Sequence, residues 1–139
     1  MPDLTITPDS AYAILLVARR FDAKVAGTDP DSGSNPSDDR SIDTLEFAPH
    51  DDTQHELVSA INDLNDDEQR DLIALILIGR GDYLLAQWAS ARQTWDDIGR
   101  AHVAQFVYEI PLVSDFLEDG LSYFNLSLGD YIMSSDDQA

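Results

Sequence analysis

The longest apolar run in the chain predicts a buried central helix. Every residue from 72 to 78 is apolar, and a helix that is apolar on all faces is normally buried on all sides. Asn65 precedes this run as a candidate N-cap, and Glu68 three positions later completes a capping box. The helix is expected to stop at Gly79–Asp82, where a glycine can take the left-handed C-terminal conformation and Asp82 can cap the next helix. The rest of the chain is therefore predicted to wrap around this helix.

Two amphipathic segments before the central helix are also predicted to be helical. Thr7 and Pro8 are typical of a helix start, with Thr7 as the cap and Pro8 in the first helical position. The apolar stripe that follows predicts a helix to about Lys24. A second helix is expected from about Thr53 to residue 62 or 64.

The C-terminal half shows two further helical patterns. Apolar side chains recur in alternating steps of four and three, which favours a long helix from residue 83 to about 108, with Gly99 as a candidate bend. The pattern leaves open whether residues 83–109 form one helix or two. Pro111 ends this pattern, because the residue before a proline disfavours the helical conformation. The last helix is expected over residues 112–124, with Gly120 tolerated inside it at a cost of about 1 kcal/mol relative to alanine.

No stretch alternates apolar and polar residues strongly enough to indicate a β-strand. The chain is therefore predicted to be all-α: a single-domain orthogonal bundle of five to six helices around the buried central helix. Residues 27–52 are expected to form a long acidic loop, because they combine many carboxylates with proline and glycine. The tail at residues 130–139 is expected to be frayed.

The charge of the chain is its most unusual bulk property. Twenty-seven acidic residues stand against eight basic ones, which gives a formal net charge of −19. Such a field repels nucleic acid and anionic membranes, so direct binding to either is not expected. Solubility and a salty habitat account for the charge most simply. A second interpretation is an acidic mimic of nucleic acid that binds a basic partner. The chain has no cysteine and no apolar run long enough to span a bilayer, and its N-terminus lacks signal-peptide features, so a cytoplasmic location is expected.

The acidic loop invites comparison with a divalent-cation site. Its candidate oxygen ligands are Asp31, Asn35, Asp38 and Asp39. The spacing does not fit an EF-hand, which requires a glutamate at the position that Arg40 occupies here. A loop held by side-chain-to-backbone turns is the simpler interpretation. We therefore expect no cofactor and keep a divalent cation as an alternative.

Three histidines keep a metal-assisted enzyme open as an alternative, in which His50, His55 or His102 would join carboxylates of the acidic loop. No nucleophile elbow or phosphate-binding loop accompanies them. The leading hypothesis is therefore a small non-catalytic interaction or regulatory module with a protein partner, although the apolar excess of the first helix also leaves room for a homodimer. Its candidate functional surface lies between the acidic loop and the Gly79–Asp82 turn, and its candidate residues are Arg80, Asp82 and Trp88.

Several blocks of the sequence resemble one known family. ARRFDAKV (Ala18–Val25), DSGSNPSDD (Asp31–Asp39), LNDDEQRDLIALILIGRGD (Leu64–Asp82) and PLVSDFLEDGL (Pro111–Leu121) are similar, in order, to the bacterial domain-of-unknown-function family numbered thirty-seven seventy-five. The chain departs from the family pattern before the glycine turn and at Tyr108–Ile110. The resemblance implies no activity, but it implies that the acidic loop is part of the domain.

Overall fold

The computed structural model describes residues 2–32 and 52–129. Side chains are described for residues 2–25 and 52–129. All regular structure in these ranges is helical, which confirms the predicted all-α class. The elements are α1 (Pro8–Ser32), a helix at residues 52–62, α3 (Asp66–Arg80), α4 (Trp88–Ile98), α5 (Val103–Tyr108) and α6 (Val113–Ser122), with 3₁₀ turns at Leu85–Gln87 and Arg100–His102. Residues 33–51 and 130–139, which include most of the predicted acidic loop and the predicted frayed tail, lie outside the described residues.

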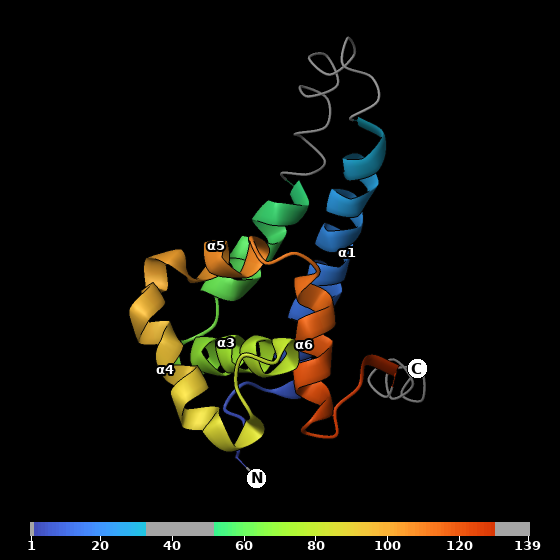
Figure 1. The fold of residues 1–139 in the computed structure, drawn as a ribbon. Helices are drawn as coiled ribbons and strands as arrows, with labels where there is room; N and C mark the ends of the chain where they lie inside the picture. The colour runs from blue at the N-terminus through green and yellow to red at the C-terminus, as the bar shows by residue number, and fades with distance from the viewer. Residues whose placement is uncertain (1, 33–51, 130–139) are drawn as a thin grey trace, which may run out of the picture.

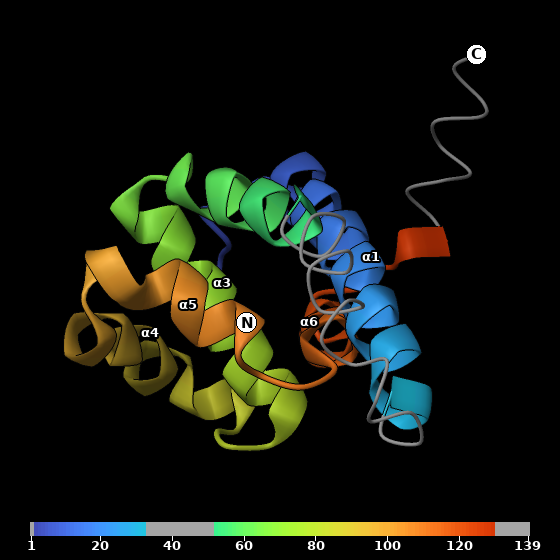
Figure 2. The same ribbon diagram turned by 90° about the horizontal axis from the view of Figure 1, so that it is seen from above.

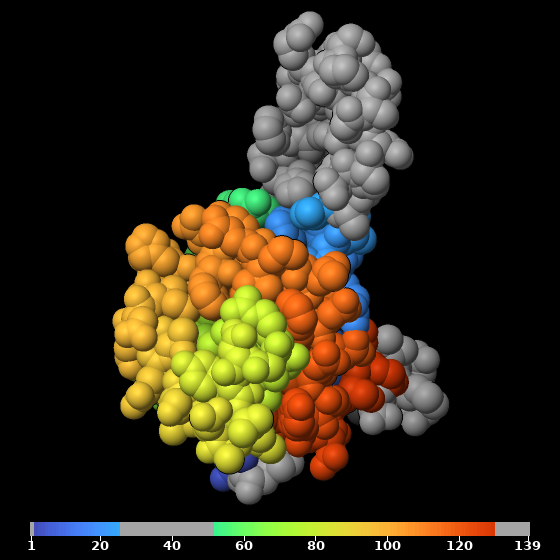
Figure 3. All heavy atoms as spheres, in the orientation of Figure 1, coloured from blue at the N-terminus to red at the C-terminus, as the bar shows by residue number. Residues whose placement is uncertain are grey.

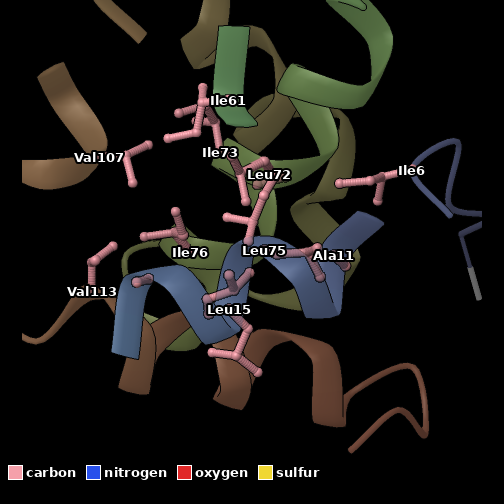
Figure 4. Packing of buried hydrophobic residues seen from close by; sticks show 14 of the residues in the cluster. Ile6, Ala11, Leu15, Ile61, Leu72, Ile73, Leu75, Ile76, Val107 and Val113 are labelled. Carbon is pink, nitrogen blue, oxygen red and sulfur yellow. The ribbon is translucent and has the colours of Figure 1, made fainter. Parts of the chain in front are cut away.

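Helix α3 lies at the centre of the molecule, as its sequence predicts. Its side chains from Leu72 to Ile78 are all buried. Figure 1 shows α3 between α4 and α6, and Figure 3 shows that only its C-terminal end and the following turn reach this face of the molecule. In the close view of Figure 4, its apolar side chains meet residues from the N-terminal segment, α1, the 52–62 helix, α5 and α6.

Both ends of α3 are closed by local hydrogen bonds. At the start, the Asn65 side chain accepts from the Glu68 N–H at 2.8 Å, and the Glu68 carboxylate accepts from the Asn65 N–H at 2.9 Å, which confirms the capping box. At the end, Gly81 is left-handed with φ +92°, and the N–H groups of Gly81 and Asp82 donate to the carbonyls of Ile78 and Leu77. The predicted role of Asp82 as the cap of the next helix is wrong, because the next helical turn begins after Leu84, its N-cap. The N–H of Asp82 instead completes a Schellman motif at the end of α3.

Helices α3 and α6 cross with their backbones in direct contact. A Cβ atom built on Gly79 would lie 1.8 Å from the Phe116 carbonyl oxygen, and one built on Gly120 would lie 2.1 Å from the Leu75 carbonyl oxygen. Each helix therefore presents a glycine to the backbone of the other. Gly120 is required here by this close approach, and its cost within the helix is offset by packing.

Two predicted boundaries are wrong. Helix α1 continues to Ser32, past the expected end near Lys24, so the predicted loop of residues 27–52 begins with helical backbone. Proline has a φ close to the helical value, so Pro30 near the end of α1 weakens the helix without ending it.

The helical region favoured over residues 83–108 is not one long helix. The structure divides it into α4 and α5, because Gly99 has φ +85° and ψ 138° and does not continue a helix. The Arg100 guanidinium then donates to the carbonyls of Asn62 and Leu64 at 2.9 Å each and to Asp66 at 2.7 Å. These bonds turn the chain back toward the start of α3.

Candidate functional site

A groove lies between the exposed side of α1 and the connection from α5 to α6. It is lined by Phe21, Asp22 and Val25 of α1 and by the segment from Tyr108 to Leu112, and its volume is about 290 Å³. Figures 1 and 2 show this connection passing from α5 to the start of α6 beside α1. We call this feature the Leu112 groove. Its walls are mostly apolar, and its volume lies near the lower end of the roughly 300–1,000 Å³ of small-molecule pockets.

Leu112 has an unusual conformation for its residue type. Its φ is +59° and its ψ is 35°, in the left-handed region, and its side chain is 54% exposed. A residue with a Cβ loses roughly 1–2 kcal/mol in this conformation, which glycine and asparagine adopt more easily. Leu112 therefore combines an unfavourable backbone with an apolar side chain in water.

The position of Leu112 is fixed by contacts between α1 and α6. The Asp22 carboxylate accepts from the Ser114 N–H at 2.9 Å and from the Ser114 hydroxyl at 2.6 Å. It thus caps the N-terminus of α6 from another helix, where a negative charge is favoured. One turn before, Arg19 donates to Asp115 at 2.7 Å and pairs with Glu118. Arg19 is therefore paired with two carboxylates of α6.

Two carboxylates line the groove, and both accept hydrogen bonds from neutral groups. Asp22 is held by Ser114, and exposed Glu109 accepts from the Gln105 side-chain amide at 3.0 Å. The arginines described by the structure, in contrast, are all engaged in ion pairs within the chain. They are Arg19, Arg20, Arg70, Arg80, Arg92 and Arg100.

The residues predicted for the functional surface do not gather at this groove. Arg80 and Asp82 form an exposed ion pair, with Arg80 Nε 2.9 Å from the carboxylate. Trp88 lies in the core with 9% of its surface exposed, and its ring centroid is 5.0 Å from that of Phe124. The Gly79–Asp82 turn is thus a compact helix end whose only charged groups pair with each other.

The predicted metal ligands can be placed only in part. Asp31 lies in the last turn of α1, whereas Asn35, Asp38, Asp39 and His50 lie outside the described residues. Among the residues that are described, no group of three or more histidines and carboxylates is arranged to hold a metal ion. His55 is exposed on the 52–62 helix, and His102 is exposed in the 3₁₀ turn after Gly99. Gly99 ends the stripe one turn before it.

A buried polar network beside α3 was missed in the sequence. Asp71 is 1% exposed, and its carboxylate accepts from the N–H groups of Thr5 and Ile6 and from Arg92 Nε at 2.8 Å. Asp71 therefore ties the N-terminal segment and α4 to the central helix. The partners come from distant parts of the chain, and the only local signal was that Asp71 directly precedes the apolar run.

A buried amide on α3 joins this helix to the 52–62 helix and to α4. Gln69 is fully buried, donates to the Ile61 carbonyl at 2.9 Å and accepts from the indole N–H of Trp95 at 2.9 Å. Arg70 lies over the Trp95 ring at 4.3 Å from its centroid. Desolvation opposes the charge of Arg70, but hydrogen bonds to Asp96 and Asp67 and their charges raise its pKa overall. Trp95 is therefore a structural residue of the core.

The fold and the groove define a small all-α domain with a central buried helix and an open apolar groove. A family model described as "Protein of unknown function (DUF3775)" matches residues 54–126. This region is just over half of the chain, so the chain belongs to that family, as the sequence blocks indicated. The match begins after the acidic loop and includes the groove residues from Tyr108 to Leu112, but not those of α1.

Among curated proteins and solved structures, none is similar enough to this chain to count as a match. No helix in residues 2–32 or 52–129 is long and apolar enough to cross a membrane.

Proposed function

We propose that this domain is a non-catalytic interaction module that binds an apolar segment of a protein partner in the Leu112 groove. The observation that carries the proposal is Leu112 itself, an exposed leucine in a left-handed conformation. Backbone strain of this kind persists only where the surrounding structure imposes it, and it is concentrated at functional sites. Contact with a bound partner would explain why leucine occupies this position.

The surroundings of Leu112 support a binding role. Val25 across the groove is 40% exposed, and exposed Pro111 adds apolar surface beside it, above the buried Ile110. Single exposed apolar residues are ordinary on a protein surface, but several that line one concavity are typical of a binding site. The groove has room for one or two apolar side chains of a partner, which is the anchor that a hot-spot interface requires.

The proposal can be tested with Leu112→Asn. Asparagine tolerates the left-handed conformation, so the variant is expected to gain about 1 kcal/mol in free energy of unfolding, measured by urea denaturation. N-acetyl-leucinamide, a neutral probe, is then titrated against methyl-labelled protein. We expect shifts confined to the groove methyl groups of Val25, Ile110 and Leu112 in the unmodified protein, and their loss in the variant.

Leu84→Asn is the matched control, since Leu84 is 70% exposed and does not line the groove. This variant should keep the probe-induced shifts. Equal shifts at all exposed leucines, or a Leu112→Asn protein that loses stability, would overturn the proposal. Equal shifts would mean that the groove is not a specific binding site. A loss of stability would mean that Leu112 stabilises the fold.

A further inference from the structure

We infer that the segment bound in the Leu112 groove is basic, with apolar side chains next to lysine or arginine. This inference rests on the proposed function and concerns the chemistry of the partner. It starts from the two carboxylates of the groove, Asp22 and Glu109. Exposed Glu109 accepts from the neutral Gln105 amide, which does not neutralise its charge. The charge of Asp22 is partly offset by the N-terminus of α6 and by Arg19, whose guanidinium donates to the Ser114 hydroxyl at 3.4 Å.

No unpaired arginine on the described surface offsets the negative charge at the groove. Each arginine of residues 2–25 and 52–129 makes an ion pair within the chain. The whole chain carries −19, so a basic partner is attracted from a distance, and oriented by Glu109 at the rim. An apolar anchor then contacts Leu112 and Val25, which exclude water from the contact.

The same charges disfavour the other apolar occupants. A second copy of this chain would bring another −19 to the interface, and this repulsion is strongest at low salt. An acidic or neutral segment would leave Glu109 without a cationic partner. Basic residues that flank an apolar anchor satisfy both features of the groove.

The test uses three acetylated and amidated peptides with the same spacing of leucines, in which the intervening residues are all lysine, all serine or all glutamate. Binding to the whole chain is measured by titration calorimetry, and the methyl shifts of Val25 and Leu112 locate it. We expect the lysine peptide to bind at least ~10-fold more tightly than the serine peptide at ~50 mM salt. The difference should shrink at ~200 mM salt, where the screening length is shorter.

Two charge variants separate a local effect from a general one. Glu109→Gln keeps the shape of the side chain at the groove, and it should weaken the lysine peptide by roughly two- to five-fold, as expected for an exposed ion pair. Asp97→Asn removes the same charge from an exposed site on α4, outside the groove, and should change the affinity little.

The outcomes distinguish the inference from the proposed function. If the serine and lysine peptides bind the groove equally, the basic-partner inference fails while the binding module stands. Equal losses in Glu109→Gln and Asp97→Asn would also overturn it, because they would show attraction to net charge alone. If no peptide moves the groove methyl groups, both fail. Concentration-dependent dimers that disappear in Leu112→Asn would replace the basic partner with a second copy.

Discussion

The crossing of α3 and α6 makes a sharp prediction about Gly120. In Gly120→Ala the new Cβ would lie 2.1 Å from the Leu75 carbonyl oxygen and 2.7 Å from its carbon. Both neighbours are backbone atoms of the central helix, so they cannot rotate away as a side chain can. The two helices would have to separate by roughly 1 Å to restore an ordinary contact.

The cost follows from what this separation opens. Leu117 and Leu121 on α6 are 1% and 0% exposed, and they belong to the same core as α3. Overpacking of this kind costs about 1–3 kcal/mol, and a gap between packed surfaces forfeits a further share of their dispersion energy. Alanine regains about 1 kcal/mol of helix propensity. We therefore expect a net loss of about 2–3 kcal/mol.

Urea denaturation followed by circular dichroism measures this loss. Gly129→Ala is the control, since no heavy atom lies within 4 Å of its Cβ position, and it should change stability by no more than about 0.5 kcal/mol. Gly79→Ala should cost as much as Gly120→Ala, and the double variant less than the sum, because one separation relieves both contacts. A Gly120→Ala protein as stable as the unmodified chain would refute the close-packed crossing.

Two further predictions concern charge. Asp71→Ala should lose about 3 kcal/mol in urea denaturation, because it leaves the N–H groups of Thr5 and Ile6 without an acceptor; the exposed Asp97→Ala should lose less than about 0.5 kcal/mol, and equal losses would contradict a structural role for Asp71. Calcium and magnesium are expected to raise the unfolding temperature only as far as sodium chloride of equal ionic strength. A bound cation at a hundred times its Kd would add about 2.7 kcal/mol, so a calcium-selective rise that vanishes in Asp38→Ala would establish a cation site instead.

Local chemistry was enough to predict the central helix. The apolar run at residues 72–78 needs no knowledge of its partners to be called buried, and the Asn65–Glu68 capping box lies within four residues of sequence. Both signals are read from neighbours along the chain. For this reason both ends of α3 were predicted correctly.

The sequence left open whether residues 83–109 form one helix or two, because the pattern is periodic on both sides of the break. The stripe from Leu84 to His102 does not show that Gly99 has a positive φ. Contacts of Arg100 with the end of the 52–62 helix and the start of α3 hold the turn, and these partners lie 34 to 38 positions away in the chain. A local sequence pattern cannot indicate contacts with such distant residues.

The groove was missed for the same reason. Phe21 and Val25 both belong to the apolar stripe of the first helix, but only Phe21 is buried, and the residues across the groove begin at Tyr108. The sequence offered only the departure from the family pattern at Tyr108–Ile110. The sequence did not indicate the left-handed conformation of Leu112, because leucine is normally a helix former and was assigned to the last helix.

The strained conformation of Leu112 depends on the packed core. A left-handed leucine persists only if the chain on either side is held more strongly than the strain it stores. Leu112 immediately precedes α6, whose first turn is capped by Asp22 and whose middle is locked against α3 through Gly79 and Gly120. The crossing that Gly120→Ala would open is therefore also what fixes one wall of the groove. A binding surface formed by a short connection can keep a defined shape here because the helix that follows it cannot move.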